Sequence, residues 1–206
     1  MYKLYYAPGT CALASHIALE EAGADYKAER LDFKSNQQNS LDYLAINPKG
    51  RVPALVTDQG VLTETPAILA FIAQAFPAAK LAPLDDAFRF AAVQAFNSYL
   101  CSTVHVAHAH KVRGYRWAAE ESSFADMKRM IPKTMGSHFA LIERDMIKGP
   151  WVMGETYTIC DPYLYTIGTW LEGDGVDVAT LPKVMAHRSR MLERPAVRKV
   201  IEAEKA

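Results

Sequence analysis

The order of hydrophobic and polar positions divides the chain into a strand-rich first part and a helical second part. In the first part, short runs rich in β-branched and aromatic residues predict strands, and 3.6-residue periodicity predicts helices. The predicted strands are Lys3–Ala7, Tyr26–Phe33, Val52–Val56 and Val61–Thr63, and the predicted helices are Thr10–Gly23 and Pro66–Phe76. The order β-α-β-β-β-α predicts one compact α/β unit.

Local signals mark the ends of these elements. Thr10 is a suitable N-cap for the first helix, and Gly23 is a suitable stop. The Asp58–Gly60 segment has the composition of a hairpin turn. The polar Ser35–Asn39 segment predicts a loop.

The second part contains few strand signals. Pro77–Asp86, which has two Pro and two Asp, predicts a linker. Helical periodicity then predicts four helices, with Pro132 kinking the second or delaying its start. Phe88, Ala92, Ala95 and Tyr99 mark the first of these helices. The other three are predicted at Phe124–Ile147, Asp161–Leu171 and Lys183–Leu192. We therefore expect two domains, at residues 1–78 and 86–206.

Composition excludes several classes of protein. The 206 residues contain 23 Lys plus Arg and 23 Asp plus Glu, so the zero net charge argues against a general nucleic-acid binder. Apolar runs end well short of the roughly 18 residues that span a membrane, and Met1–Gly9 lacks the pattern of a secretory signal. The three Cys, at 11, 101 and 160, are far apart and predict free thiols in reducing cytoplasm.

Cys11 is the first candidate for chemistry. It follows the predicted N-cap of a helix, where free backbone N–H groups and the helix dipole favour an anion and lower a thiol pKa. The alternative is a small buried Cys without reactivity. Tyr5 and Tyr6 end the preceding strand, and either could donate a hydrogen bond to a sulfur or belong to the core.

Two Pro-containing segments could bind a ligand through the backbone. Pro53 lies at the start of a predicted strand, although proline has no N–H to donate to a neighbouring strand. A cis Val52–Pro53 peptide bond is one way to accommodate it. The backbone N–H and C=O of Val52 would then be free to bind an extended peptide. Glu64 and Thr65 precede a helix whose N-terminus can hold a carboxylate. Glu64 could pair with an amino group, although capping by Thr65 explains this segment equally well.

Other polar residues of the second part have simpler explanations. His105 and His108 are helical neighbours, but no carboxylate lies at helical spacing, so we expect a His facing a thiol in preference to a metal site. Thr158 and Asp161 fit a variant of the capping box. Cys101 and Cys160 lie in apolar helical contexts and are expected to be structural.

Taken together, these segments resemble the cytosolic glutathione S-transferases, most closely the bacterial beta class, over essentially the whole chain. Four motifs occur in the family's order, and their combination is more specific than any one of them. They are Tyr5-Tyr-Ala-Pro-Gly-Thr-Cys-Ala-Leu-Ala-Ser-His16, Asn47-Pro-Lys-Gly-Arg-Val-Pro-Ala-Leu55, Leu62-Thr-Glu-Thr-Pro-Ala-Ile68 and Thr158-Ile-Cys-Asp-Pro-Tyr-Leu164.

The resemblance implies a thioredoxin-like N-terminal domain, an all-helical C-terminal domain and a homodimer. It also implies that Cys11 and His105 act on the sulfur of glutathione and that no metal is needed. The glutathione-binding residues that it implies are Tyr6, Thr10, Lys34, Val52, Pro53, Glu64 and Thr65. Lys34 would approach the glycyl carboxylate. Two positions depart from the family: Val106, where a basic residue is common, and Ser98, where an Asn reached from the partner is expected.

The resemblance implies a cytoplasmic detoxification enzyme that conjugates the glutathione thiolate to small apolar electrophiles. The expected electrophile wall includes Tyr115, Trp117 and the His108–His110 region. Two alternatives stay open: a glutathione-dependent thiol–disulfide reductase that uses a Cys11 mixed disulfide, and a non-catalytic ligand-binding or scaffold module of the same fold.

Overall fold

The computed structural model describes residues 1–205, and its strand-rich part is a four-stranded sheet in the order β2-β1-β3-β4. The strands are β1 (Tyr2–Tyr6), β2 (Tyr26–Arg30), β3 (Ala54–Thr57) and β4 (Gly60–Thr63). β1 and β2 are parallel, whereas β3 is antiparallel to both β1 and β4. The four predicted strands are confirmed, and the sheet is thioredoxin-like as expected.

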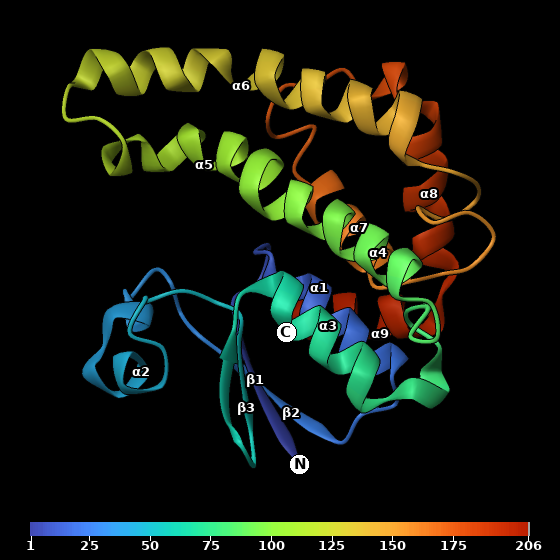
Figure 1. Cartoon of the computed structure of the whole chain (residues 1–206). Coiled ribbons are helices and arrows are strands. Elements are labelled where there is room, and N and C mark those ends of the chain that lie inside the picture. The colour runs from blue at the N-terminus through green and yellow to red at the C-terminus, as the bar shows by residue number, and fades with distance from the viewer. Residues whose placement is uncertain (206) are drawn as a thin grey trace.

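Three α-helices accompany the sheet: α1 (Ala12–Glu21), α2 (Leu41–Ile46) and α3 (Thr65–Ala75). The sequence did not predict α2, because six residues are too few to establish helical periodicity. Its local signal is Ser40, whose hydroxyl accepts a hydrogen bond from the backbone N–H of Tyr43. Figure 1 shows α1 and α3 between the sheet and the helices of the second part.

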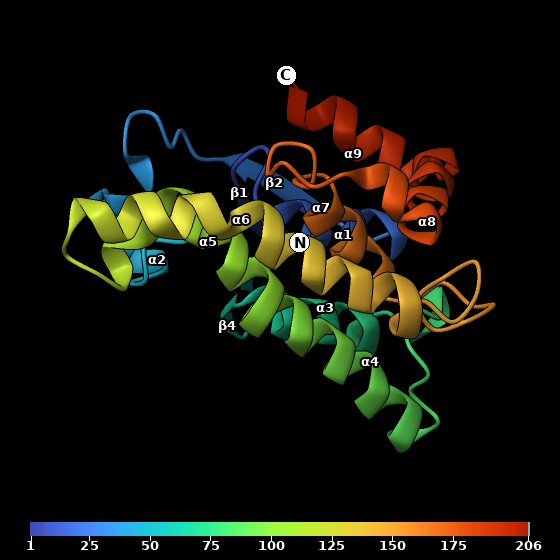
Figure 2. The ribbon, with the colours of Figure 1, turned by 90° about the horizontal axis from the view of Figure 1, so that it is seen from above.

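The second part is helical. Its α-helices are α4 (Ala87–Tyr99), α5 (His105–Arg113), α6 (Glu121–Leu141), α7 (Cys160–Gly168), α8 (Pro182–Glu193) and α9 (Pro195–Lys205). A π-helical turn at Leu100–Val104 joins α4 to α5, and Pro132 lies inside α6. Figure 2 shows α4 and α5 following one another along one side of the molecule. No helix of residues 1–205 is long and apolar enough to cross a membrane.

The apolar residues that repeat with helical spacing are buried in one long helix and not in the other. In α6, Ile131, Met135 and Phe139 follow one another at intervals of four residues and are buried. In α4, Val93, Phe96 and Asn97 are buried, whereas Phe88, which marked the helical periodicity, is 85% exposed. Periodicity identifies an apolar stripe, but it does not say what covers that stripe.

One hydrophobic core joins the two parts. The cluster contains Leu4 and Leu55 of the sheet, Ile17 of α1, Phe139 of α6 and Tyr163 of α7. The position of α1 at the centre of this core fixes the loop that precedes it, which carries Gly9, Thr10 and Cys11.

Candidate active site

A cavity of about 710 Å³ lies between the loops of the strand-rich part and helix α5. Seven of the predicted site residues line this cavity, and two do not. The seven are Thr10, Cys11, Val52, Pro53, Glu64, Thr65 and His105. Residues up to 95 positions apart, Thr10 and His105, therefore contribute to one site.

Tyr6 and Lys34 lie away from the cavity. Tyr6 is only 6% exposed, and its ring lies 5.1 Å from the ring of His16 in the interior. Lys34 is exposed in the loop after β2, where its backbone N–H donates to Asp32. The geometry therefore assigns neither side chain to this cavity.

Cys11 lies at the N-terminus of α1, but the pKa of its thiol is raised and not lowered as expected. Burial is the main influence and raises the pKa of Cys11, although the Thr65 hydroxyl and the Arg113 guanidinium act in the opposite direction. The expected lowering of the Cys11 pKa is therefore wrong, because desolvation of the thiol outweighs the groups that lower its pKa. The thiol donates a hydrogen bond to the Val52 carbonyl at 3.5 Å.

The segment that carries Val52 and Pro53 is held by several hydrogen bonds. The carbonyl of Arg51 accepts from the Tyr43 hydroxyl and from the Asn47 side chain, each at 2.6 Å. Gly50 has a φ of +60°, a backbone conformation that favours glycine, and a Cβ there would also displace the Asn39 side chain, whose Oδ1 would lie 2.7 Å away. The Val52–Pro53 peptide bond is cis.

Glu64 has an unusual backbone at the start of α3. Its φ is +71°, a conformation that a non-glycine residue rarely adopts. The Glu64 carboxylate accepts from Lys49 Nζ at 2.6 Å, and Thr65 is already the first residue of the helix. Thr65 is therefore not the N-cap that the sequence suggested, and its hydroxyl acts to lower the pKa of the Cys11 thiol.

His105 begins α5 on the opposite wall of the cavity. Burial, followed by the charges of His108 and Arg113, lowers the pKa of His105 from 6.5 to about 4. Its imidazole is therefore neutral at pH 7 and has one N–H donor for a sulfur. The ring lies 5.0 Å from the ring of Trp170.

Trp170 connects α5 to the Cys11 loop. Its Nε1 donates to the Gly9 carbonyl at 3.1 Å, and His108 stacks on its ring with centroids 4.3 Å apart. His108 Nδ1 also contacts Asp174 Oδ2 at 2.7 Å, and Lys111 Nζ lies 3.0 Å from Oδ1 of the same buried carboxylate. Sequence spacing could not identify Asp174, because it comes from the segment after α7.

Several cavity residues were not predicted. Four cationic side chains line the cavity: Lys49, Arg51, Arg113 and Arg116. Arg113 and Arg116 belong to the basic segment Lys111–Arg116, and this local concentration of positive charge could have indicated them as candidate site residues. Cys101, expected in the core, is only partly buried and also lines the cavity, whereas Cys160 is buried as expected.

The histidine cluster is arranged by aromatic contacts. Tyr115, Trp117 and His108 line the cavity, and His110 packs against Trp117 with ring centroids 4.3 Å apart. Within residues 1–205, no group of three or more His, Cys, Asp and Glu side chains is arranged to hold a metal ion.

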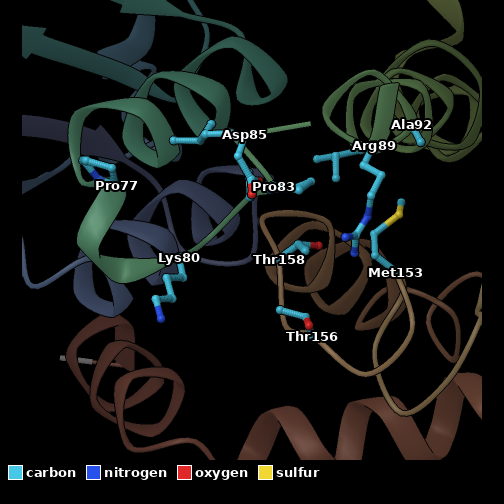
Figure 3. A pocket seen from close by; sticks show the side chains of 12 residues that line it. Pro77, Lys80, Pro83, Asp85, Arg89, Ala92, Met153, Thr156 and Thr158 are labelled. Carbon is cyan, nitrogen blue, oxygen red and sulfur yellow. The ribbon is translucent and has the colours of Figure 1, made fainter. Parts of the chain in front are cut away.

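A second cavity of about 450 Å³ lies beside the linker between the two parts. Figure 3 shows Pro83 and Asp85 on the linker side of this cavity and Arg89 and Met153 on the other side. It contains none of the predicted site residues. The chemistry suggested by the sequence therefore belongs to the cavity beside Cys11.

Comparisons with known proteins agree with this geometry. The family model "Glutathione S-transferase, N-terminal domain" matches residues 1–74. The chain is 32% identical to glutathione S-transferase GstA of Escherichia coli O157:H7 over 205 residues, which cover 98% of each protein. The chain belongs to the glutathione S-transferase family.

Solved structures include similar proteins of nearly the same length. A glutathione transferase homologue from Sulfitobacter, solved with bound glutathione, has a TM-score of 0.95 and 46% identity over 98% of each chain. A bacterial beta-class glutathione S-transferase from Sphingomonas chungbukensis has a TM-score of 0.84 and 31% identity, again over 98% of each chain. These similarities confirm the family resemblance and the expected architecture.

Proposed function

We propose that the protein is a glutathione transferase that conjugates the glutathione thiolate to small electrophiles. The observation that carries this proposal is the single cavity that brings Cys11, Val52–Pro53, Glu64–Thr65 and His105 together. In this proposal, residues 1–78 form the glutathione-binding domain and residues 86–206 form the electrophile wall.

Each end of glutathione has a counterpart in the cavity. The γ-glutamyl ammonium would pair with Glu64, and its carboxylate would meet the N-terminus of α3 at Thr65. The cysteinyl backbone would pair with the backbone of Val52. The sulfur would then lie at the N-terminus of α1, beside Thr10 and Cys11.

At this position the thiol of glutathione can ionise more readily. The helix terminus and the N–H of neutral His105 both stabilise a sulfur anion. Lowering the pKa of a thiol from about 9 to about 7 raises the thiolate fraction at neutral pH on the order of 100-fold. The thiolate attacks the electrophilic carbon, a C–S bond forms, and the leaving group departs with its electron pair.

Steady-state turnover of 1-chloro-2,4-dinitrobenzene with glutathione tests this assignment. We expect Cys11→Ala and His105→Ala each to lower kcat/KM by roughly 10-fold or more, since each removes a contact to the sulfur. His138→Ala, on α6 and outside the cavity, is the control and should retain activity. If both site variants retain wild-type kcat/KM and wild-type affinity for glutathione, the assignment is wrong.

A second candidate activity is reduction of disulfides through Cys11, because this thiol lines the proposed glutathione site. The Cys11 thiolate would attack oxidised glutathione, forming the mixed disulfide and releasing one reduced glutathione. The raised pKa of Cys11 favours conjugation over this activity at neutral pH. Intact-mass measurement of Cys101→Ser after treatment with oxidised glutathione separates the two, because the absence of a one-glutathione adduct excludes the reductase.

We also propose that the protein is a cytoplasmic homodimer. The exposed stripe of α4, which includes Phe88, Ala91, Ala92 and Ala95, supports this assembly. An exposed apolar stripe of this kind is typical of a surface that a second copy covers.

A further inference from the structure

The residues that line the cavity carry more positive than negative charge. The cavity lining has four Lys and Arg side chains and a single carboxylate, that of Glu64, which is paired with Lys49. The ion pairs found among residues 1–205 do not include Arg51, Arg113 or Arg116. Three guanidinium groups therefore face the same space without an acidic partner in the described chain.

Arg113 is the most constrained of the three. It is half-buried at the C-terminal end of α5, and burial together with the charge of Arg116 lowers its pKa. Holding a half-buried guanidinium beside other cations is unfavourable unless an anion occupies the site at some stage.

The position of Arg113 relates it to the reacting sulfur. His105, Ala109 and Arg113 are spaced four residues apart on α5, and all three line the cavity. Eight residues of helix span about 12 Å, and helical side chains lean toward the N-terminus, so Arg113 leans back toward His105. The small side chain of Ala109 leaves space between them, and the Arg113 charge acts on both Cys11 and His105.

Glutathione does not neutralise all of these cations. Its γ-glutamyl carboxylate meets the N-terminus of α3, where Lys49 is already paired with Glu64. Its glycyl carboxylate would be bound by Arg51, on the same side of the cavity as Val52. Arg113 and Arg116 are left over on the opposite wall, together with Tyr115 and Trp117. Aromatic side chains next to unpaired guanidinium groups match an aromatic ring with an anionic substituent.

We propose that the second substrate is an aromatic electrophile that carries a carboxylate or a similar anion, and that Arg113, supported by Arg116, binds this anion. The inference rests on the proposed transferase function and specifies its substrate class. The guanidinium groups take no part in bond exchange: the thiolate forms the C–S bond, and the leaving group departs as an anion.

Two matched electrophiles test the inference. The neutral probe is 2-chloro-1,3-dinitrobenzene, and the anionic probe is 4-chloro-3,5-dinitrobenzoate, which differs from it only in the added carboxylate. Both lose chloride when glutathione adds. We expect Arg113→Gln to lower the ratio of kcat/KM for the anionic over the neutral probe by about 10- to 100-fold, with the KM for glutathione unchanged. Arg113→Lys should restore part of the ratio because it keeps the charge but loses the planar fork. Arg129→Gln, an exposed α6 variant with the same charge change, should leave the ratio unchanged.

A binding measurement separates failure of this inference from failure of the proposed function. The two conjugates, S-(2,6-dinitrophenyl)glutathione and S-(4-carboxy-2,6-dinitrophenyl)glutathione, quench tryptophan fluorescence and require no turnover. A wild-type preference for the carboxylated conjugate that Arg113→Gln abolishes supports the inference, even if neither probe is turned over. Equal affinities in the wild type, or a rise in the glutathione KM for Arg113→Gln with an unchanged ratio, would overturn it.

Discussion

At the scale of single residues, the environment decides the chemistry of the site. Cys11 stands where a helix N-terminus favours a thiolate, yet burial keeps its pKa above the ordinary value. His105 is neutral at pH 7 because burial and nearby cations lower its pKa to about 4. Cys11 and His105 are therefore both uncharged at pH 7. In the proposed complex, the thiolate of glutathione is the charged group that the site stabilises.

The pKa of His105 predicts a dependence of stability on pH. Unfolded His105 takes up a proton near pH 6.5 but folded His105 only near pH 4, so its protonation favours unfolding as the pH falls from about 6.5 to about 4. We expect this group to contribute about 1–3 kcal/mol to the stability lost between pH 7 and pH 4.5. His105→Gln should lose that much less stability over the same interval in urea unfolding without glutathione.

Lys133→Gln is the control, since Lys133 is exposed on α6. Its free energy of unfolding should fall between pH 7 and pH 4.5 by the same amount as that of the wild type. An equal loss of stability in His105→Gln and the wild type would contradict the assigned pKa.

At the scale of elements, buried polar contacts set the positions of helices. Asp161 is fully buried, and its carboxylate accepts from the backbone N–H groups of Val152 and Thr158 and contacts His187 Nε2 at 3.0 Å. The Thr158 hydroxyl accepts from the N–H of Cys160 in return. This reciprocal arrangement at the start of α7 is the predicted capping box, joined by a contact to α8 that the sequence did not indicate.

Loss of this carboxylate should destabilise the whole chain. Asp161→Ala leaves two buried N–H groups and the His187 ring without their partner, so we expect the free energy of unfolding to fall by roughly 2–4 kcal/mol. Asp126→Ala removes an exposed acidic group on α6 and should cost less than roughly 1 kcal/mol. Comparable urea midpoints for the two variants would show that Asp161 has no special structural role.

At the scale of the whole molecule, the exposed face of α4 bears on assembly. Phe88 projects from this face with 85% of its surface exposed. Burying one Phe side chain contributes about 1.5–3 kcal/mol, and a symmetric dimer buries two. Such a contribution is large enough to decide whether the dimer persists at micromolar concentration.

Replacing this side chain should therefore weaken the proposed dimer. We expect Phe88→Asp to raise the dimer dissociation constant by at least about 100-fold, measured by sedimentation equilibrium. Leu192→Asp, which changes another exposed apolar residue on α8, should remain dimeric. A Phe88→Asp protein that assembles like the wild type would exclude this face as the interface.

The sequence by itself determined the four strands, most of the helices except α2 and α9, and, of the nine predicted site residues, the seven that line the cavity. Strand composition, the stop at Gly23 and the periodicity of Ile131, Met135 and Phe139 depend on near neighbours, so the local pattern predicted them. The motifs around Cys11, Val52–Pro53 and Glu64–Thr65 are also local patterns, and each contributes residues to the cavity lining.

The tertiary structure decided what depends on distant segments. It enclosed the Cys11 thiol among atoms that desolvate it and so raised its pKa. It brought Asp174 to His108, kept Lys34 outside the cavity and left the stripe of α4 exposed. It also placed Arg113 across from Cys11, which the run of basic residues could not indicate. Desolvation and the distances between charges depend on the packing of the whole chain, and a one-dimensional pattern does not contain them.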